Sequence, residues 1–448
     1  MEKNMKEKTY QTKPVHTLRG SVEVAPDKSI SHRALLFAAI AKGESKISNL
    51  LLSEDVLRTL TIINQLGIQT SHTAQTLKEK DELIVFGKGL DGLTKPEETL
   101  FCGNSGTTMR LMIGLLAGQS FQASLTGDDS LNKRPMDRVI EPLQEMGATI
   151  VSEDVDDKRL ITITPKETSG EKYLKGISYE SPVASAQVKS AILLAGLYAR
   201  KPISVSEPRQ SRNHTELMLK SLRGKVSIQD LMVTIDCPTR LKALDLTVPG
   251  DLSSAAAFIA AALIVKDSEL TIRNVNLNPT RTGMVDILRY MGAKITTDVK
   301  NVINGEAVGH IHVQTSRLKN ISITGNIIPR MIDEIPMLAL IASVSEGKMV
   351  VSGAQELRVK ESDRIKAICK TLQQLGVRVD EKEDGFIIVG NPEGLRIQDG
   401  VDFHSYGDHR IAMMQSIAGL VLDKAVKIDD VSCVDTSFPG FFKILEKF

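Results

Sequence analysis

The sequence lacks a strong excess of charge of either sign. Its 56 Lys and Arg residues stand against 55 Asp and Glu, a formal net charge of +1, whereas nucleic-acid-binding proteins usually carry a large basic excess. Long hydrophobic runs are also missing. The longest, Ala255 to Val265, has eleven residues, and a helix of that length is too short to span a bilayer. We therefore expect neither a nucleic-acid partner nor a membrane partner.

Cysteine is scarce, and tryptophan is absent, although the absence of tryptophan excludes nothing. Cys102, Cys237, Cys369 and Cys433 lie far apart and form no CxxC pair, so neither a disulfide framework nor a zinc site is indicated. A reduced, cytoplasmic setting fits this usage best. The first residues, MEKNMKEKTYQTK, contain no apolar stretch, and we do not expect a secretory signal.

The chain does have the length and composition of a multidomain globular protein. It has 448 residues, of which 42% are hydrophobic and 25% are charged, values typical of soluble globular proteins. One ordinary hydrophobic core does not extend over such a length. The sequence therefore predicts two domains, or three.

One segment pattern recurs six times along the chain. Each copy has a small or polar start, then an Ala/Leu-rich stretch, and in most copies a β-branched strand follows. Successive copies are separated by 76, 80, 68, 80 and 76 residues when one marker is taken from each start. The markers are Ser29, Ser105, Ser185, Ser253, Asp333 and His409. Such spacing indicates internal repeats.

A second helical segment follows each copy. Its apolar residues recur at spacings of three and four, and it usually ends in Leu or Met followed by Gly, which suits a left-handed helix cap. In ELMLKSLRGKVSI the Gly is displaced by one residue. The pattern therefore predicts the order strand–helix–strand–helix–strand in each repeat, and each repeat is long enough for one further strand. Chance recurrence in an α/β protein is the alternative, and six paired copies argue against it. We expect two similar three-repeat domains with a break near residues 244–251.

Polar residues gather at the predicted helix starts. A single Ser, Asn or Asp at such a position is more often only a cap. Cations are different, because the helix N-terminus favours anions and offers a cation nothing. Basic residues at these starts therefore suggest that an anion lies among them, although any one of them can instead be a solvated surface residue. They are Arg33, Arg110, Arg134, Arg212, Lys360, Arg364 and Arg410.

The segment RVKESDRIKAI adds a carboxylate to this basic set. Lys360 and Arg364 are four residues apart and share a helix face, and Glu361 lies beside them. One interpretation is an ordinary charged helix start with local ion pairing. The other is a proton donor or acceptor among cations. The residues alone leave both open.

Six segments together resemble one family. PDKSISHR, GNSGTTMRL, KRPMDR, SAQVKSAILLAGL, RVKESDR and DHRIAM occur in order between residues 26 and 414. They are similar to the signature segments of the 5-enolpyruvylshikimate-3-phosphate synthase family, and SAQVKSA, KRPM and MIDE resemble its divergent bacterial subgroup, class II. The resemblance implies an α/β fold of two similar domains, each of three βαβαββ repeats (an inside-out α/β barrel), with the active site in the interdomain cleft. It also implies that residues 20–247 form one domain and residues 1–19 plus 248–448 the other.

The resemblance implies an activity as well. Members of the family transfer the enolpyruvyl (carboxyvinyl) group of phosphoenolpyruvate to the 5-hydroxyl of shikimate 3-phosphate and release phosphate, a step of aromatic amino acid biosynthesis. No cofactor and no metal are implied. We expect a cytoplasmic monomer, with glyphosate as a possible inhibitor.

Roles carry over to matching positions only by this resemblance. Asp333 would take the proton from the 5-hydroxyl, Glu361 would donate a proton to the methylene carbon, and Lys28 would act beside them. Shikimate 3-phosphate would be held by Lys28, Ser29, Arg33, Ser185, Ala186, Gln187, Arg212, Asp333 and Lys360. Phosphoenolpyruvate would be held by Lys28, Asn104, Gly106, Arg134, Gln187, Arg364 and Arg410. The residues Thr107, Arg110 and His409 would line the same site.

One position departs from the family pattern. Thr436 stands where plant-like members carry a Lys, so phosphoenolpyruvate binding needs another cation here or does without. Gly106 is the position whose replacement by Ala is associated with glyphosate tolerance in the family. Because Gly leaves room for the inhibitor, we expect sensitivity.

Two other functions compete with this interpretation. The sister transferase that acts on UDP-N-acetylglucosamine would show Lys-Asn in place of Lys28-Ser29 and usually a Cys in the loop matching GDDSLNKRP, which contains none. A non-catalytic phosphate-binding protein on the same fold would lose the acid–base pair, yet Asp333 and Glu361 are both present.

Overall fold

The computed structural model describes residues 8–155, 158–165, 174–237 and 240–448. Residues 1–7, part of the segment predicted not to be a secretory signal, lie outside the described residues. The chain divides into two compact units. The first unit comprises residues 26–248 and 302–306, and the second comprises residues 1–25, 249–301 and 307–448. Each unit is described below by itself.

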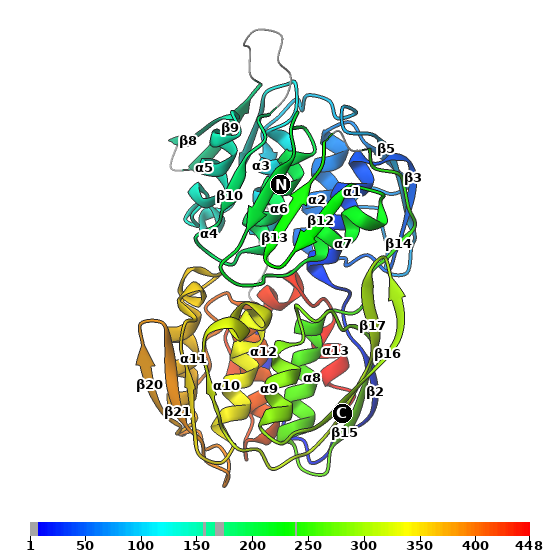
Figure 1. Cartoon of the computed structure of the whole chain (residues 1–448). Coiled ribbons are helices and arrows are strands. Elements are labelled where there is room, and N and C mark those ends of the chain that lie inside the picture. Colours follow the sequence, from blue (N-terminus) through cyan, green and yellow to red (C-terminus); the bar gives the residue numbers. More distant parts are fainter. Residues whose placement is uncertain (1–7, 156–157, 166–173, 238–239) are drawn as a thin grey trace. The chain divides into compact units, whose positions relative to one another are not determined.

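The first unit consists of three repeats of helix, strand, helix and hairpin (Figure 1). Its helices are α1 (Lys28–Ile40), α2 (Glu54–Gln65), α3 (Gly106–Leu116), α4 (Asp129–Asn132), α5 (Asp137–Glu145), α6 (Ala186–Gly196) and α7 (His214–Ser221). Its strands are β3 (Lys42–Ser48), β4 (Gln69–Thr70), β5 (Leu83–Lys88), β6 (Leu100–Phe101), β7 (Ala123–Thr126), β8 (Thr149–Val155), β9 (Lys158–Thr164), β10 (Ser178–Glu180), β11 (Ile203–Ser206), β12 (Val226–Gln229), β13 (Met232–Ile235) and β14 (Leu246–Thr247).

The sheets of the first unit share one strand order. They run β14-β3-β5-β4, β6-β7-β9-β8 and β10-β11-β13-β12. In each sheet the first pair of strands is parallel and the other pairs are antiparallel. A parallel pair needs a crossover, which α3 supplies between β6 and β7 and α6 supplies between β10 and β11. The predicted repeat is therefore confirmed, and the further strand completes a βαβαββ unit.

The second unit repeats this plan. Its helices are α8 (Leu252–Ile264), α9 (Gly283–Tyr290), α10 (Ile335–Ser343), α11 (Arg364–Gln374), α12 (His409–Ala418) and α13 (Phe441–Leu445), with 3-10 turns η1 (Gly325–Arg330), η2 (Ile332–Glu334), η3 (Gln355–Val359), η4 (Gly419–Val421) and η5 (Ser432–Thr436). Its strands are β1 (Tyr10–Gln11), β2 (Arg19–Glu23), β15 (Glu269–Asn276), β16 (Lys294–Ile303), β17 (Glu306–Gln314), β18 (Ser322–Ile323), β19 (Lys348–Val351), β20 (Arg378–Lys382), β21 (Gly385–Val389) and β22 (Lys427–Ile428).

Two sheets of the second unit have the same strand order as those of the first, and a third is reduced. The orders are β16-β17-β15-β2, β18-β19-β21-β20 and the pair β1-β22. Strand β2 lies parallel to β15, just as β14 lies parallel to β3 in the first unit. In both places a strand distant in sequence takes the first position of a repeat. The last repeat contains α12 and α13, and among the described residues no hairpin follows α13.

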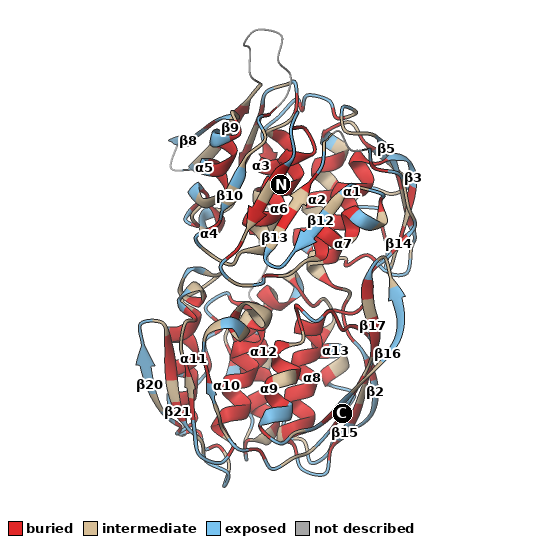
Figure 2. Cartoon of the chain, in the orientation of Figure 1, coloured by how far each residue is buried: buried red, intermediate tan, exposed pale blue. Residues whose placement is uncertain are grey.

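The first helix of each repeat is the buried one. Helix α8, LSSAAAFIAAALI, is buried along nearly its whole length (Figure 2), as expected for a helix that is apolar all round. Second helices such as α2 and α11 bury one face only. Among the described residues, no helix combines the length and apolar character needed to cross a membrane.

Glycines end the second helices as predicted. Gly67, Gly147, Gly292 and Gly376 have φ of 83°, 92°, 94° and 72°, the left-handed region that glycine adopts without strain. Where the sequence displaces the Gly by one residue, Arg223 takes the left-handed conformation instead, with φ of 64°. The turn after α7 therefore keeps the left-handed geometry, although Arg adopts it less readily than Gly.

Candidate functional site

Three buried helices of the first unit begin with a side-chain cap. Asp27 accepts a hydrogen bond from the amide of Ile30 at 2.9 Å, and Ser105 accepts one from Thr108 at 3.1 Å. Ser185 caps α6 in the same way. The cap interpretation is therefore correct at these starts. Each cap satisfies one of the amides at the start of its helix, and the remaining ones keep the polarity that attracts an anion.

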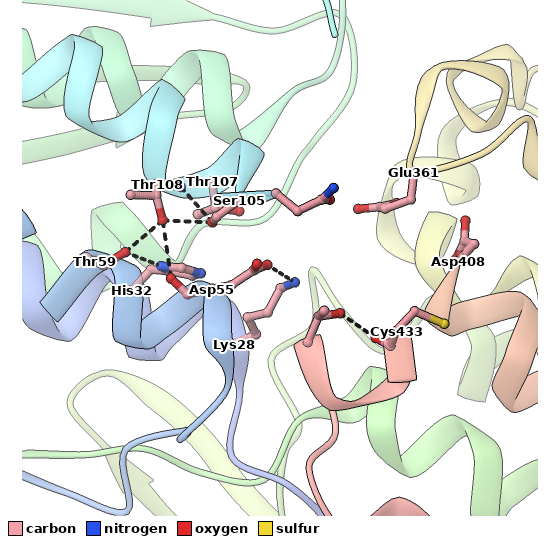
Figure 3. A network of polar contacts seen from close by, with 12 residues as sticks. Lys28, His32, Asp55, Thr59, Ser105, Thr107, Thr108, Glu361, Asp408 and Cys433 are labelled. Carbon is pink, nitrogen blue, oxygen red and sulfur yellow. Dashed lines mark hydrogen bonds and ion pairs between the residues drawn. The ribbon is translucent and has the colours of Figure 1, made fainter. Parts of the chain in front are cut away.

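A chain of hydroxyl and imidazole groups links the helices α1, α2 and α3 (Figure 3). His32 Nδ1 lies 2.8 Å from Thr59 Oγ1, which lies 2.8 Å from Thr108 Oγ1. Thr108 donates in turn to Ser105 Oγ at 2.7 Å. Burial, and then the charges of Lys28 and Arg33, hold the pKa of His32 well below its ordinary value. The imidazole is therefore neutral at pH 7, and the chain of hydrogen bonds connects α1 and the start of α3 through the middle of α2.

Lys28, the first residue of α1, forms an ion pair that the sequence did not reveal. Its ammonium group lies 2.6 Å from Asp55 Oδ2 in α2 (Figure 3). Asp55 sits in the first turn of α2, where an acidic residue is ordinary. For that reason its sequence context gave no sign of a partner in another helix. The pair holds the Lys28 side chain beside the start of α3.

A second cluster surrounds Gly106, the first residue of α3. Arg110 Nη1 donates to Gln187 Oε1 at 2.5 Å, and Gln187 Nε2 donates to Thr107 Oγ1 at 2.9 Å. A Cβ atom on Gly106 would lie 3.0 Å from Arg110 Nη1 and 3.3 Å from Arg134 Nη1. The starts of α3 and α6 and two guanidinium groups therefore meet around Gly106.

Arg134 is held by Asn104. Its Nη2 donates to Asn104 Oδ1 at 2.5 Å, and Asn104 Nδ2 donates to Asp128 Oδ2 at 2.8 Å. Arg134 is buried, so it is not a solvated surface residue. Asn104, Gly106 and Arg134 were predicted to act on the same ligand, and the structure brings them together.

Arg33 is buried inside the first unit. It donates to the carbonyl of Ser29 at 3.0 Å, to Ser190 Oγ at 2.8 Å and to Thr215 Oγ1 at 2.7 Å. Burial lowers the pKa of Arg33 to about 10, which leaves the guanidinium protonated at neutral pH. Arg212, half-buried between β11 and α7, also contributes to this lowering. The surface alternative is therefore wrong for Arg33.

The second unit places two predicted catalytic carboxylates on one guanidinium. Arg364 donates to Asp333 Oδ1 at 3.1 Å and to Glu361 Oε2 at 2.5 Å, and its Nε donates to Asp408 Oδ2 at 2.8 Å. The Arg364 side chain is buried, with 2% of its surface exposed. Burial alone would lower the pKa of Arg364, but Asp408, Glu361 and Asp333 together raise it. The family resemblance implied that Arg364 binds phosphoenolpyruvate, and in the structure its guanidinium is paired with carboxylates.

Asp408 anchors this arrangement. It caps α12 by accepting from the amide of Arg410 at 2.9 Å, and it accepts from Ser362 Oγ at 3.0 Å. His409 and Arg410, the first residues of α12, are both buried. Asp408 is the first residue of the segment DHRIAM, and no role of its own was predicted for it. Its partner Arg364 lies 44 residues away, and helix periodicity says nothing about such a pair.

Two further predicted site residues, and the residue that departs from the family pattern, lie at the ends of helices or in a 3-10 turn. Lys360 is half-buried at the end of η3, and Ala186 is the first residue of α6. Thr436 Oγ1 donates to the carbonyl of Cys433 at 2.7 Å, so its hydroxyl is used within η5. Among the described residues, no group of three His, Cys, Asp or Glu side chains is arranged to hold a metal ion.

Comparison with solved structures defines the class of protein. An enolpyruvyl transferase from Streptomyces tendae superimposes with a TM-score of 0.75 at 16% identity over 98% of this chain and 96% of its own, a likeness of fold alone. EPSP synthase from Acinetobacter baumannii gives a TM-score of 0.84 at 38% identity, with 98% of each chain covered. The fold is therefore that of the enolpyruvyl transferases.

The sequence comparisons narrow the class to one family. The model of the family EPSP synthase (3-phosphoshikimate 1-carboxyvinyltransferase) matches residues 12–445. A 3-phosphoshikimate 1-carboxyvinyltransferase from Petrotoga mobilis is 47% identical over 435 residues, 97% of this chain and 98% of its own. One from Thermodesulfovibrio yellowstonii is 47% identical over 438 residues, with the same coverage. The chain belongs to the EPSP synthase family and is a carboxyvinyl transferase, which confirms the resemblance.

Proposed function

We propose that this chain transfers the enolpyruvyl group of phosphoenolpyruvate to the 5-hydroxyl of shikimate 3-phosphate and releases phosphate. The observation that carries this proposal is the pair Asp333 and Glu361 on the buried guanidinium of Arg364. The reaction needs one group that accepts a proton and one that donates a proton. Two carboxylates held by one cation can divide these roles, as the family membership leads us to expect.

The proton transfers balance with these two residues. Glu361 donates a proton to the methylene carbon of phosphoenolpyruvate, and the 5-hydroxyl oxygen bonds to the adjacent carbon while Asp333 takes the hydroxyl proton. The resulting tetrahedral intermediate loses phosphate as its C–O bond breaks with the electron pair going to the phosphate oxygen. Glu361 takes back the proton from the methyl carbon, and Asp333 passes its proton to the departing phosphate. Lys28 stabilises charge that develops on the oxygens, because its ammonium group is positioned in advance by Asp55.

The first unit supplies most of the substrate contacts. Arg33, Ser29, Ser185, Ala186, Gln187 and Arg212, with Lys360 of the second unit, bind shikimate 3-phosphate. Asn104, Gly106, Arg134 and Arg410 bind phosphoenolpyruvate, with Thr107, Arg110 and His409 beside them. Clustered guanidinium groups suit phosphorylated carboxylates because they bind oxygen pairs in a bidentate manner. Arg364 also binds phosphoenolpyruvate, which requires that it exchange a carboxylate partner for the substrate.

Several properties of the whole protein belong to the same proposal. The enzyme works as a cytoplasmic monomer without a cofactor. Its folding domains are residues 20–247 and residues 1–19 plus 248–448, except that strand β2 folds with the second. Glyphosate inhibits it, because Gly106 leaves space at the start of α3. Thr436 adds no cation, so the cations that hold phosphoenolpyruvate are Lys28 and the arginines.

One assay tests the activity and its main rival together. Phosphate release from phosphoenolpyruvate is measured with shikimate 3-phosphate or with UDP-N-acetylglucosamine as the acceptor. We expect release only with shikimate 3-phosphate. Release that depends on UDP-N-acetylglucosamine contradicts the proposal, and so does the absence of release with either acceptor.

A further inference from the structure

Helix α6 carries a buried lysine between two buried glutamates. Lys189 Nζ lies 2.8 Å from Glu207 Oε2 and 2.8 Å from Glu216 Oε1. The side chains of Lys189, Glu207 and Glu216 are 3%, 3% and 1% exposed. Burial alone would lower the pKa of Lys189, but Glu216 and Glu207 raise it, so the ammonium group stays charged. These three residues are called the Lys189 cluster.

Glu207 connects the cluster to the start of α6. Its Oε1 accepts a hydrogen bond from the amide of Ser185 at 3.0 Å, and its Oε2 accepts one from Ser211 Oγ at 2.8 Å. Ser185 is the cap of α6. A carboxylate that accepts from a backbone amide forms a charge-assisted hydrogen bond. The orientation of the cap residue therefore depends on Glu207, which Lys189 holds in place.

Glu216 connects the cluster to Arg33. The hydroxyl groups of Ser190 and Thr215 accept from Arg33 and lie 2.7 Å from one another. Ser190 follows Lys189 in α6, and Thr215 precedes Glu216 in α7. The charge of Glu216 also raises the pKa of Arg33, against the lowering caused by burial. The cluster thus lies directly behind both hydroxyl groups that hold the guanidinium.

We infer that the Lys189 cluster is a positioning network, which fixes Ser185 and Arg33 in the geometry that receives the phosphate-bearing acceptor. This inference rests on the proposed function, in which both residues bind shikimate 3-phosphate. The cluster itself touches no substrate. It sets the spacing between a helix cap on α6 and a guanidinium on α1, and Lys189 offsets negative charge that would otherwise oppose an anion.

A purely structural role explains the cluster less well. Replacing a complete buried ion network by neutral residues of similar volume is often neutral or stabilising, whereas removing one partner is costly. Lys189 lies in a helix whose other buried residues are mainly Ala, Leu, Ile and Val, where an apolar side chain would pack without desolvation. Retaining three buried charges therefore fits a positional role better than a stabilising one.

The decisive variant removes all three charges together, as Lys189→Met, Glu207→Gln and Glu216→Gln in one chain. We expect its melting temperature to stay within a few degrees of the wild-type value. Its KM for shikimate 3-phosphate should rise about tenfold or more, the effect of losing roughly 1.4 kcal/mol of binding free energy. Its KM for phosphoenolpyruvate should change less than about threefold, because the loss is of binding to one substrate only.

A control variant separates positioning from stability. Ile192→Ala removes a buried side chain from the same helix, at a residue that is 0% exposed, and makes no change to the cluster. It should lower the melting temperature and leave both KM values unchanged. If the triple variant fails to fold, Glu207→Gln alone tests the positioning role. Its KM for shikimate 3-phosphate should rise at least about threefold, because one charge-assisted hydrogen bond is weakened.

The outcomes distinguish this inference from the proposed function. An unchanged KM for shikimate 3-phosphate in the deciding variant overturns the positioning role, and so does an equal rise in both KM values. If the wild-type enzyme itself shows no phosphate release that depends on shikimate 3-phosphate, the proposed function fails first. A selective rise in KM, with Ile192→Ala unaffected, supports the inference.

Discussion

Arg364 is the residue that joins the two proposed catalytic carboxylates of the second unit. Its guanidinium contacts three carboxylates, and each comes from a different segment of the chain: η2, the residues before α11, and the cap of α12. Hydrogen bonds from a buried guanidinium to carboxylates are charge-assisted and directional, so they hold these side chains in place in the absence of substrate. Asp333 and Glu361 therefore have fixed directions before any substrate binds.

Removing either carboxylate's ability to exchange protons should abolish turnover with little loss of binding. Asp333→Asn and Glu361→Gln keep the shape and one hydrogen-bond acceptor for Arg364. We expect kcat to fall by about 10²- to 10⁴-fold, with each KM within a few-fold of wild type. Steady-state phosphate release measures both. Asp363→Asn is the control, since Asp363 caps α11 and pairs with Arg358 instead. Normal kcat in either carboxylate variant would refute the assigned roles.

Gly106 sets the space at the start of α3. In Gly106→Ala the new methyl group would lie 3.0 Å and 3.3 Å from the guanidinium nitrogens of Arg110 and Arg134, so both side chains must shift slightly. We expect the KM for phosphoenolpyruvate to rise about tenfold, or roughly 1.4 kcal/mol. The glyphosate concentration for half-inhibition should rise further, because the methyl group occupies the space left by Gly. Inhibition curves that coincide for the two proteins would contradict this expectation.

At the scale of elements, the helix starts converge because the buried helices pack closely. Helices α3 and α6 approach so near that a Cβ atom on Gly114 would lie 2.3 Å from the carbonyl oxygen of Ala191. Only Gly permits such an approach between two backbones. This contact brings the start of α3, with Arg110, to the start of α6, with Gln187.

Gly114→Ala should therefore destabilise the protein although Ala favours helix formation. The neighbouring atoms are backbone and cannot rotate away, and overpacking of this kind costs about 1–3 kcal/mol. Unfolding by urea measures the change. Gly106→Ala, which meets only flexible side-chain atoms, should lose much less stability. Equal stability of the two variants would show that the helices separate without cost.

The elements were largely predictable, and their long-range partners were not. Helix periodicity and the terminal glycines are local signals, so the repeats and their second helices could be predicted. Asp55 with Lys28 and Asp408 with Arg364 join segments that are 27 and 44 residues apart, and no local pattern records such a pairing. The two-residue strand β14 is too short to show alternation. Lys189 did carry a signal, since a lysine inside an Ala/Leu-rich helix suggests a buried ion pair.

At the scale of the whole molecule, neither unit is a continuous piece of chain. Strand β2 comes from the N-terminal part and pairs with β15 in the second unit, and residues 302–306 return to the first unit. There His214 Nδ1 lies 2.6 Å from Glu306 Oε1, with both side chains buried. Loss of structure in the first unit therefore releases a segment that belongs, in sequence, to the second.

This interdependence gives one buried histidine an influence on overall stability. The folded protein holds the pKa of His32 well below 6.5, the ordinary value that the unfolded chain regains. Below about pH 6.5 the unfolded state therefore binds a proton that the folded state does not, and stability falls as the pH falls. The contribution of His32 to the free energy of unfolding is therefore fully present above about pH 6.5.

The expected slope is up to about 1.4 kcal/mol per pH unit below pH 6.5, until the pH reaches the pKa of His32 in the folded protein. Urea unfolding at a series of pH values between about 7.5 and 5 measures it, a window centred on the ordinary histidine pKa. His32→Asn keeps a polar group near Thr59 but cannot take up the proton, so its curve should be flatter by that amount. Parallel curves for the two proteins would mean that His32 accepts a proton in the folded state. In that case the hydroxyl chain from Thr59 to Ser105 does not require a neutral imidazole.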